Sequence, residues 1–322
     1  MNMENYMKNF YIILLLILSF TIFSCAKKSD DSSSSTTSSS LSFLAVGASG
    51  TILTSADGTT WTAQTSGTSN NLRAVAYDGS STLVAVGFSG TILTSSDGTT
   101  WTSRTSGTSK DINNVHYADS AFVVVGDNGT VLSSSDGITW TDETSGCGAW
   151  DNESLWGITY GNSTWVANGD NGSIYSYDGS TCTKRTSGTT EEFNEVIYEN
   201  STFVAFGNNG TIRTSSDGTT WDNRTSGTSN DLPGGTYGNS IFVSVGGNSV
   251  GGDGTILTSS DATTWTSRTS GSSNKLRGVT YGNSTFVAVG VSGTILTSSD
   301  ATTWTSRTSG TSLNFRRVFY KE

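Results

Sequence analysis

The chain has little of what metal enzymes and nucleic-acid-binding proteins depend on. It contains one histidine, one proline and three cysteines in 322 residues, and 14% of its residues are charged. These are too few His and Cys for a zinc site of ordinary type, and we expect neither a metal nor a cofactor. The formal net charge of −10 leaves no basic stripe to neutralise phosphates, so we expect no nucleic-acid partner.

The abundant residues favour a sheet protein. There are 38 glycines, many Ser and Thr residues, and no evident amphipathic helix after residue 41. Such a composition suits short strands joined by tight turns.

The N-terminus is typical of an exported lipoprotein. An apolar run over residues 10–23 has the length of a signal-peptide core and is short for a membrane span. It ends at Ser24-Cys25, which resembles a lipobox, so we predict a signal peptide over residues 1–24 and lipidation of Cys25. Met7 fits the start of such a segment better than Met1. An uncleaved membrane anchor is the alternative.

Residues 25–41 predict a flexible tether, because a Ser/Thr run after Lys27 and Lys28 has nothing apolar to bury. Ala26 carries no inner-membrane retention signal. We therefore expect an outer-membrane protein, held at the membrane by its lipid alone and facing either the periplasm or the exterior.

Internal repeats dominate the remainder of the chain. Tryptophans recur about 40 residues apart, and Cys182 occupies the one vacant slot in the series. The seven copies are marked by Trp61, Trp101, Trp140, Cys182, Trp221, Trp265 and Trp304.

Each copy reads as four short strands separated by Gly, Asn, Asp and Ser, which is typical of a β-propeller blade. The folded part begins in mid-repeat at residue 42 and ends on an orphan first strand over 315–320. We therefore predict an all-β fold over residues 42–322: a seven-bladed β-propeller with four antiparallel strands per blade. Pairing of the C-terminal strand with the N-terminal strands closes the ring and removes two exposed edges.

A turn motif before each Trp carries a family resemblance. It is clearest at residues 95–101, Ser-Ser-Asp-Gly-Thr-Thr-Trp. The motif resembles the Asp-box of BNR-type sialidase repeats, one residue shorter than usual, and is closer to repeats of the photosystem II stability and assembly-factor type. The resemblance covers residues 42–322 and implies a propeller fold.

Residues that recur in every copy are interpreted as structural, because seven equivalent copies cannot form one active site. A turn Asp accepts backbone N–H bonds, and the Trp covers the outer strands. The same interpretation covers the outer-strand arginines and a buried His116. The sets are Asp57, Asp97, Asp136, Asp178, Asp217, Asp261 and Asp300, and Arg104, Arg185, Arg224, Arg268 and Arg307.

Function is expected where the copies differ. Loops between blades and loops between second and third strands emerge on one face of a propeller, and insertions at 147–153 and 247–253 fall there. Simple loop drift is the alternative. The predicted binding residues are Phe88, Asp127, Asn128, Trp150, Asp151, Asp170, Asn171, Glu191 and Glu192.

A second candidate site lies at the mouth of the central channel. Arg73, Arg277 and Arg316 begin first strands on consecutive blades once the ring is closed. Together they could hold a carboxylate or sulfate, although pairing with acidic neighbours on the rim is the ordinary fate of such residues.

Cys147 and Cys182 invite a disulfide in an exported protein. The repeat alignment places them near opposite ends of outer strands in neighbouring blades, too far apart for a bridge. We therefore expect no disulfide between them.

These features favour a non-enzymatic, monomeric binding module on the cell envelope, whose partner is an envelope or extracellular protein or glycan. A sialidase-like glycoside hydrolase is one alternative, but it needs an acid and base pair beside the arginines, and the sequence shows none. A surface or structural protein without a specific ligand is the other.

Overall fold

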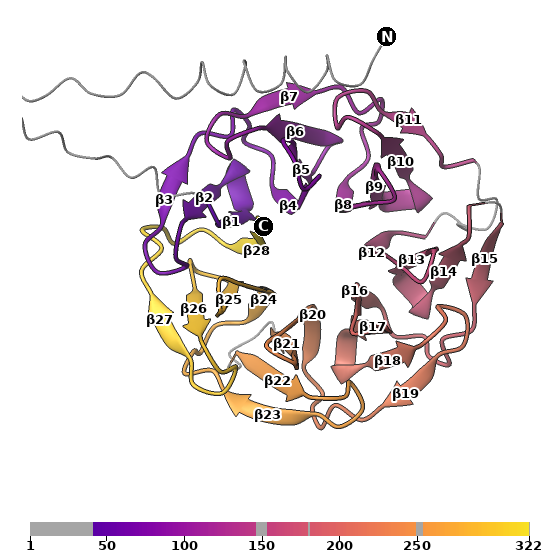
Figure 1. The fold of residues 1–322 in the computed structure, drawn as a ribbon, viewed down its shortest axis with the longest axis vertical. Helices are drawn as coiled ribbons and strands as arrows, with labels where there is room; N and C mark the ends of the chain where they lie inside the picture. Colours follow the sequence, from indigo (N-terminus) through magenta and orange to yellow (C-terminus); the bar gives the residue numbers. More distant parts are fainter. Residues whose placement is uncertain (1–40, 146–152, 180, 249–253, 322) are drawn as a thin grey trace, which may run out of the picture. The chain divides into compact units, whose positions relative to one another are not determined.

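Seven four-stranded antiparallel sheets surround a central axis in the part of the chain that the structure describes (Figure 1). The structure is a computed structural model, and it describes residues 41–145, 153–179, 181–248 and 254–321. The signal peptide, Cys25 and most of the tether lie outside these residues. Blade 1 consists of β28, β1, β2 and β3, and blades 2 to 7 follow in chain order from β4 to β27. The predicted seven-bladed propeller is confirmed.

The first strand of each blade lies nearest the axis, and the fourth lies at the rim (Figure 1). The first strands are β28 (Phe315–Tyr320), β4 (Leu72–Tyr77), β8 (Ile112–Ala118), β12 (Leu155–Gly161), β16 (Phe193–Glu199), β20 (Asp231–Gly238) and β24 (Leu276–Gly282). The second strands are β1 (Phe43–Gly47), β5 (Leu83–Gly87), β9 (Ala121–Gly126), β13 (Thr164–Gly169), β17 (Thr202–Gly207), β21 (Ile241–Gly247) and β25 (Thr285–Gly290).

The third strands are β2 (Ile52–Ser55), β6 (Thr91–Ser95), β10 (Val131–Ser134), β14 (Ile174–Tyr177), β18 (Ile212–Ser215), β22 (Thr255–Ser259) and β26 (Ile295–Ser298). The fourth strands are β3 (Thr62–Gln64), β7 (Thr102–Arg104), β11 (Thr141–Asp142), β15 (Cys182–Arg185), β19 (Asp222–Arg224), β23 (Thr266–Thr269) and β27 (Thr305–Arg307). Short 3₁₀ turns follow four of the second strands: η1 (Ala48–Gly50), η2 (Asp127–Gly129), η3 (Asp170–Gly172) and η4 (Asn208–Gly210). Among the described residues, no helix is both long and apolar enough to span a membrane.

The core lies between neighbouring blades. Each of seven apolar clusters in the described residues takes its side chains from two consecutive sheets, for example Leu44 and Ile52 of blade 1 with Leu72 and Leu83 of blade 2. A second strand is therefore covered on both faces, which explains why β1 is buried at all five positions. Each blade depends on its neighbours for burial, so the ring must close.

Closure occurs as the sequence predicts. Strand β28 pairs antiparallel with β1, with Phe43 opposite Tyr320 and Ala45 opposite Val318. Phe315 is fully buried in the cluster that joins blades 7 and 1. The last strand of the chain thus completes the sheet that the first three strands leave open.

The Asp turns are structural, as predicted. Asp97 Oδ1 accepts the backbone N–H groups of Thr99 and Thr100, both at 2.8 Å, and these bonds lower the pKa of Asp97. Trp101 Nε1 donates to the carbonyl of Gly98 at 3.1 Å, and its ring packs against the cluster between blades 1 and 2. The outer-strand arginines also serve the blade, because Arg104 Nε donates to Thr94 Oγ1 on the neighbouring strand.

Cys182 is disulfide-bonded. The prediction of no bridge between Cys147 and Cys182 stays a prediction, because the partner cysteine lies outside the described residues. The sequence offers Cys25 and Cys147 as partners, and both lie outside the described residues. The prediction assumed that Cys147 holds a regular repeat position. Cys147 begins the insertion 147–153, and a lengthened loop does not fix the distance between the two sulfur atoms.

A candidate binding site at the channel mouth

Each first strand carries a β-bulge near its start. In blade 2, Leu72 pairs with Gly87 and Ala74 with Val86, which leaves Arg73 as the extra residue. The same irregularity isolates Arg277 between Leu276 and Gly278. It also isolates Arg316 opposite Val46 and Gly47. A bulge redirects side chains away from the strict alternation of a strand, and bulges are common beside functional sites.

The bulged residues lie beside the turns between second and third strands. Asn113 Nδ2 donates to Asp127 Oδ1 at 2.9 Å, and Trp156 Nε1 donates to Asp170 Oδ1 at 2.6 Å. The loops between blades reach the same edge, since Phe88 N–H donates to the carbonyl of Asn71 at 3.0 Å. The variable loops and the channel mouth, two separate predictions from the sequence, therefore form one surface.

Arg73 is held between two aromatic rings at this surface. Its guanidinium carbon lies 4.5 Å from the centroid of Phe88 and 4.9 Å from that of Trp156. Arg316 lies 6.0 Å from the same Trp156 ring. The buried Nε of Arg73 has no hydrogen-bond partner among the described residues. Phe88 is half-buried under Arg73, so it is less exposed than an interface anchor of the kind the sequence suggested.

The three predicted arginines line one cavity. It has a volume of about 140 Å³ and is lined by Ala48, Asn71, Leu72, Arg73, Phe88, Arg277, Asn314 and Arg316. Within the described ranges, no salt bridge joins any of these arginines to a carboxylate. Acidic neighbours still act at longer range, because Asp111 and Asp127 oppose the lowering of the pKa of Arg73, and Glu192 opposes that of Arg316. Three guanidinium groups face one small space that has room for an anionic group.

Burial and mutual repulsion disfavour the charged form of the arginines at the cavity. Burial, with the positive charges of Arg73 and Arg277, lowers the pKa of Arg316 to about 9. Burial also lowers the pKa of Arg277 and of Arg73. An anion bound here would relieve this mutual repulsion through charge-assisted hydrogen bonds.

Acidic residues occupy the blades that follow those of the arginines around the mouth. Asp127 and Asp170 belong to blades 3 and 4, and burial together with the charge of Asp170 raises the pKa of Glu192. Glu191 Oε2 accepts a hydrogen bond from Asn209 at 2.8 Å. Two further predicted residues, Asn128 and Asn171, occupy turn tips with positive φ. Trp150 and Asp151 lie outside the described residues.

A set of polar contacts that links blades inside the channel was not predicted from the sequence. Arg317 forms an ion pair with Glu195 and donates to the carbonyl of Pro233 at 3.2 Å, so blade 1 is linked to blades 5 and 6. Asn114 Nδ2 reaches Glu195 from blade 3 at 3.5 Å. The bulge makes consecutive residues 316 and 317 both face the axis, which simple strand alternation does not predict. The doublet Arg316-Arg317 was the available signal.

The site is thus an arginine-lined pocket in the mouth of a β-propeller. No protein-family model and no curated protein matches the chain. Among solved structures, it is similar to YCF48 bound to a D1 peptide, with 19% identity, TM-score 0.59, and coverage of 74% of this chain and 82% of the other. YCF48 from Cyanidioschyzon merolae matches at 16% identity and TM-score 0.58, covering 75% and 86%.

The computationally designed propeller Ika8 matches at 15% identity and TM-score 0.54, over 71% and 70% of the two chains. At these identities the likeness establishes the fold. The resemblance to the photosystem II assembly-factor type of propeller is confirmed at that level. The link to BNR-type repeats and the lipoprotein signal stay predictions.

Proposed function

We propose that this protein is a non-enzymatic cell-envelope lipoprotein whose propeller binds a protein partner at the channel mouth. Its pocket, lined by Arg73, Arg277 and Arg316, would take a carboxylate of the partner, either a chain terminus or an Asp or Glu side chain. Cys25 would carry the lipid that holds the protein at the outer membrane.

The carrying observation is the convergence of three arginines on one cavity without a direct ion pair to a carboxylate among the described residues. Guanidinium groups in partly buried sites bind carboxylates through paired, short hydrogen bonds. Phe88 and Trp156 orient Arg73 through their ring faces. Arg73 therefore loses less conformational entropy when a ligand binds.

The comparison with YCF48 supports a protein partner over a glycan. That propeller has been solved with a peptide of D1 bound, so the same fold can serve as a peptide receptor. A hydrolase would need an acid and base pair next to the arginines. The residues lining the pocket instead offer three arginines, two asparagines and apolar groups, which suit binding.

The test is a binding screen of the full-length protein in detergent against arrayed envelope-protein C-terminal peptides with free or amidated ends, and against glycans. We expect binding to free carboxylates that is lost in Arg316→Gln. The matched control is Arg307→Gln, since Arg307 donates to Thr297 on the outer strands and lies far from the mouth. Binding that survives Arg316→Gln, or that is confined to neutral glycans, would overturn the proposal.

The pH dependence supplies a second readout. A bound carboxylate favours the protonated guanidinium, so affinity should be complete below about pH 9, the pKa of Arg316, and should fall above it. Affinity that rises with pH between pH 8 and pH 10 would contradict the role of Arg316.

A further inference from the structure

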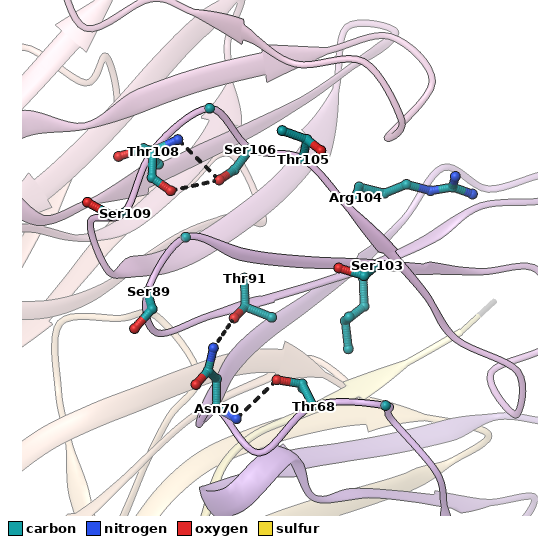
Figure 2. A pocket seen from close by; sticks show the side chains of 14 residues that line it. Thr68, Asn70, Ser89, Thr91, Ser103, Arg104, Thr105, Ser106, Thr108 and Ser109 are labelled. Carbon is teal, nitrogen blue, oxygen red and sulfur yellow. Dashed lines mark hydrogen bonds between the residues drawn. The ribbon is translucent and has the colours of Figure 1, made fainter.

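Two clefts of the same construction open between neighbouring blades, away from the channel mouth. The cleft of blade 2 has a volume of about 590 Å³ and that of blade 6 about 600 Å³. The walls are the loop arriving from the preceding blade, the blade's own outer strand and the loop that leaves this strand. Figure 2 shows the blade 2 cleft, with Thr68 and Asn70 on one side and Ser103 on the other.

In blade 5 the equivalent space is filled by the side chain of Arg213, which is 7% exposed. Its Nε donates to the carbonyl of Ser187 at 2.7 Å and its Nη2 to that of Gly188 at 3.2 Å. Nη1 bonds to the Oδ1 of Asn223 on the outer strand. One guanidinium therefore bridges both walls of the cleft, and its protein acceptors are all neutral.

In blades 2 and 6, the third and fourth strands pair in the same register as in blade 5. Arg213 pairs with Asn223 across the sheet, and Leu93 pairs with Ser103 at the corresponding position of blade 2. In blade 6, Leu257 pairs with Ser267. Blades 2 and 6 thus have a leucine where blade 5 has its arginine, and Leu93 lines the cleft of blade 2.

The arriving loop also keeps one conformation. Gly188 has a φ of 70°, and its equivalents Gly67 and Gly227 have φ values of 77° and 75°. The preceding serine bonds through Oγ to the carbonyl two residues later in each loop, at 3.2 Å in all three. The carbonyls that bind Arg213 therefore have counterparts at 66–67 and 226–227, and those counterparts accept no hydrogen bond from a described residue.

We propose that the clefts of blades 2 and 6 bind arginine side chains of a partner protein, in the position that Arg213 occupies in blade 5. The planar fork of a guanidinium reaches several acceptors at once, which an ammonium cannot do. The net charge of −10 favours a basic partner. This site is independent of the proposed function at the channel mouth, which attracts anions.

The arginine that lines each cleft does not exclude a second guanidinium. Arg104 is held by its Nε bond to Thr94, and Figure 2 shows its side chain extending away from Thr68 and Asn70. In blade 5, Arg224 holds the same position as Arg104 while Arg213 fills the cleft beside it. Both cations therefore coexist in blade 5, where Asp222 forms an ion pair with Arg224 at 2.9 Å; blades 2 and 6 have Thr102 and Thr266 at the position of Asp222.

The test counts binding sites on the full-length protein in detergent, by calorimetric titration with acetyl-Gly-Arg-Gly-amide. Its capped ends remove the charges that the channel mouth would recognise. The Leu93→Arg and Leu257→Arg variants place an arginine where blade 5 has one, and each should lower the number of peptides bound by one. Arg213→Leu empties the blade 5 cleft and should raise it by one.

General destabilisation would lower the number of bound peptides in every variant, whereas the proposal predicts a decrease in two variants and an increase in Arg213→Leu. Thermal melting of each variant checks that it is folded. The matched probes are the same capped peptide with lysine or citrulline in place of arginine, and both should bind much more weakly than the arginine peptide. A site count that is the same in all variants would overturn the proposal, as would equal binding of the citrulline peptide, which lacks the charge.

Discussion

Removal of the Phe315 side chain should weaken the ring at its closure. Phe315 is fully buried between blades 7 and 1, with Phe43 and Val289 in the same cluster. A Phe→Ala change in such a core costs about 3–5 kcal/mol, from lost burial and from the cavity left behind. At roughly 2–4 °C per kcal/mol for a domain of this size, Phe315→Ala should lower the melting temperature by roughly 10 °C.

The matched control is Phe193→Ala. Phe193 starts the first strand of blade 5, is equally buried, and lies on a strand continuous with its own blade. Both variants should melt earlier by similar amounts, because both leave the same cavity. Only Phe315→Ala should loosen the pairing of β28 with β1, since β28 ends the chain and is held to its sheet by noncovalent contacts alone.

Amide hydrogen exchange over residues 43–47 is the assay. In Phe315→Ala these amides should exchange faster than the rest of the core, whereas in Phe193→Ala they should keep the protection of the native protein. Equal protection of residues 43–47 in the two variants would refute the view that β28 can detach from β1 while the other blades stay folded.

Three further predictions concern an outer turn, a histidine of a first strand and the ion pair inside the channel. Asp97→Ala removes two backbone N–H bonds at an exposed turn and should cost about 1 kcal/mol in urea unfolding, whereas Asp97→Asn keeps an acceptor and should cost less. Burial lowers the pKa of His116 to about 4 from 6.5, so the unfolded chain takes up a proton first as the pH falls. Stability should be complete above about pH 6.5 and decline by about 3 kcal/mol down to pH 4, and His116→Phe should flatten that part of the profile. Arg317→Leu strands Glu195 in the channel and should cost about 3–5 kcal/mol, whereas the double variant with Glu195→Leu should recover most of it. A double variant no more stable than Arg317→Leu would contradict the pairing.

The fold was predictable because its signals repeat. Seven Trp or Cys182 markers set the blade length, and the incomplete repeats at the two ends required β28 to join β1. Asp97 and its equivalents were correctly interpreted as turn formers, since a property shared by all blades belongs to the blade. A short apolar run by itself is ambiguous between helix and strand. Seven aligned copies remove that ambiguity.

The site was predicted in pieces and assembled only by the structure. Arg73, Arg277 and Arg316 were placed at the mouth from the start of their strands, but the bulge that redirects them leaves no mark in an alternating pattern. For the same reason Arg317, the next residue along, was not expected to face the channel.

The prediction about Cys147 and Cys182 depends on a different physical argument. Repeat alignment gives a residue its blade and strand, and it holds where sheet register fixes the backbone. An insertion releases a loop from that register, so the alignment of Cys147 with a regular repeat position no longer measures a distance. The same limit applies to Trp150 and Asp151 in that insertion.

A ring of near-identical blades gains specificity only where one blade departs from the rest. Each first strand whose pairing is irregular presents its bulged residue to the same mouth, so side-chain identity there decides the chemistry. Arginines on blades 7, 1 and 2 line a pocket that includes Ala48, whereas Asn113 and Trp156 donate hydrogen bonds to Asp127 and Asp170. The charge asymmetry of the mouth follows from a few substitutions on a constant backbone. Arg213 illustrates the same rule at the periphery, because it fills in blade 5 a space that is an open cleft in blades 2 and 6. Binding sites in this fold therefore require little new structure, only a departure from the repeat.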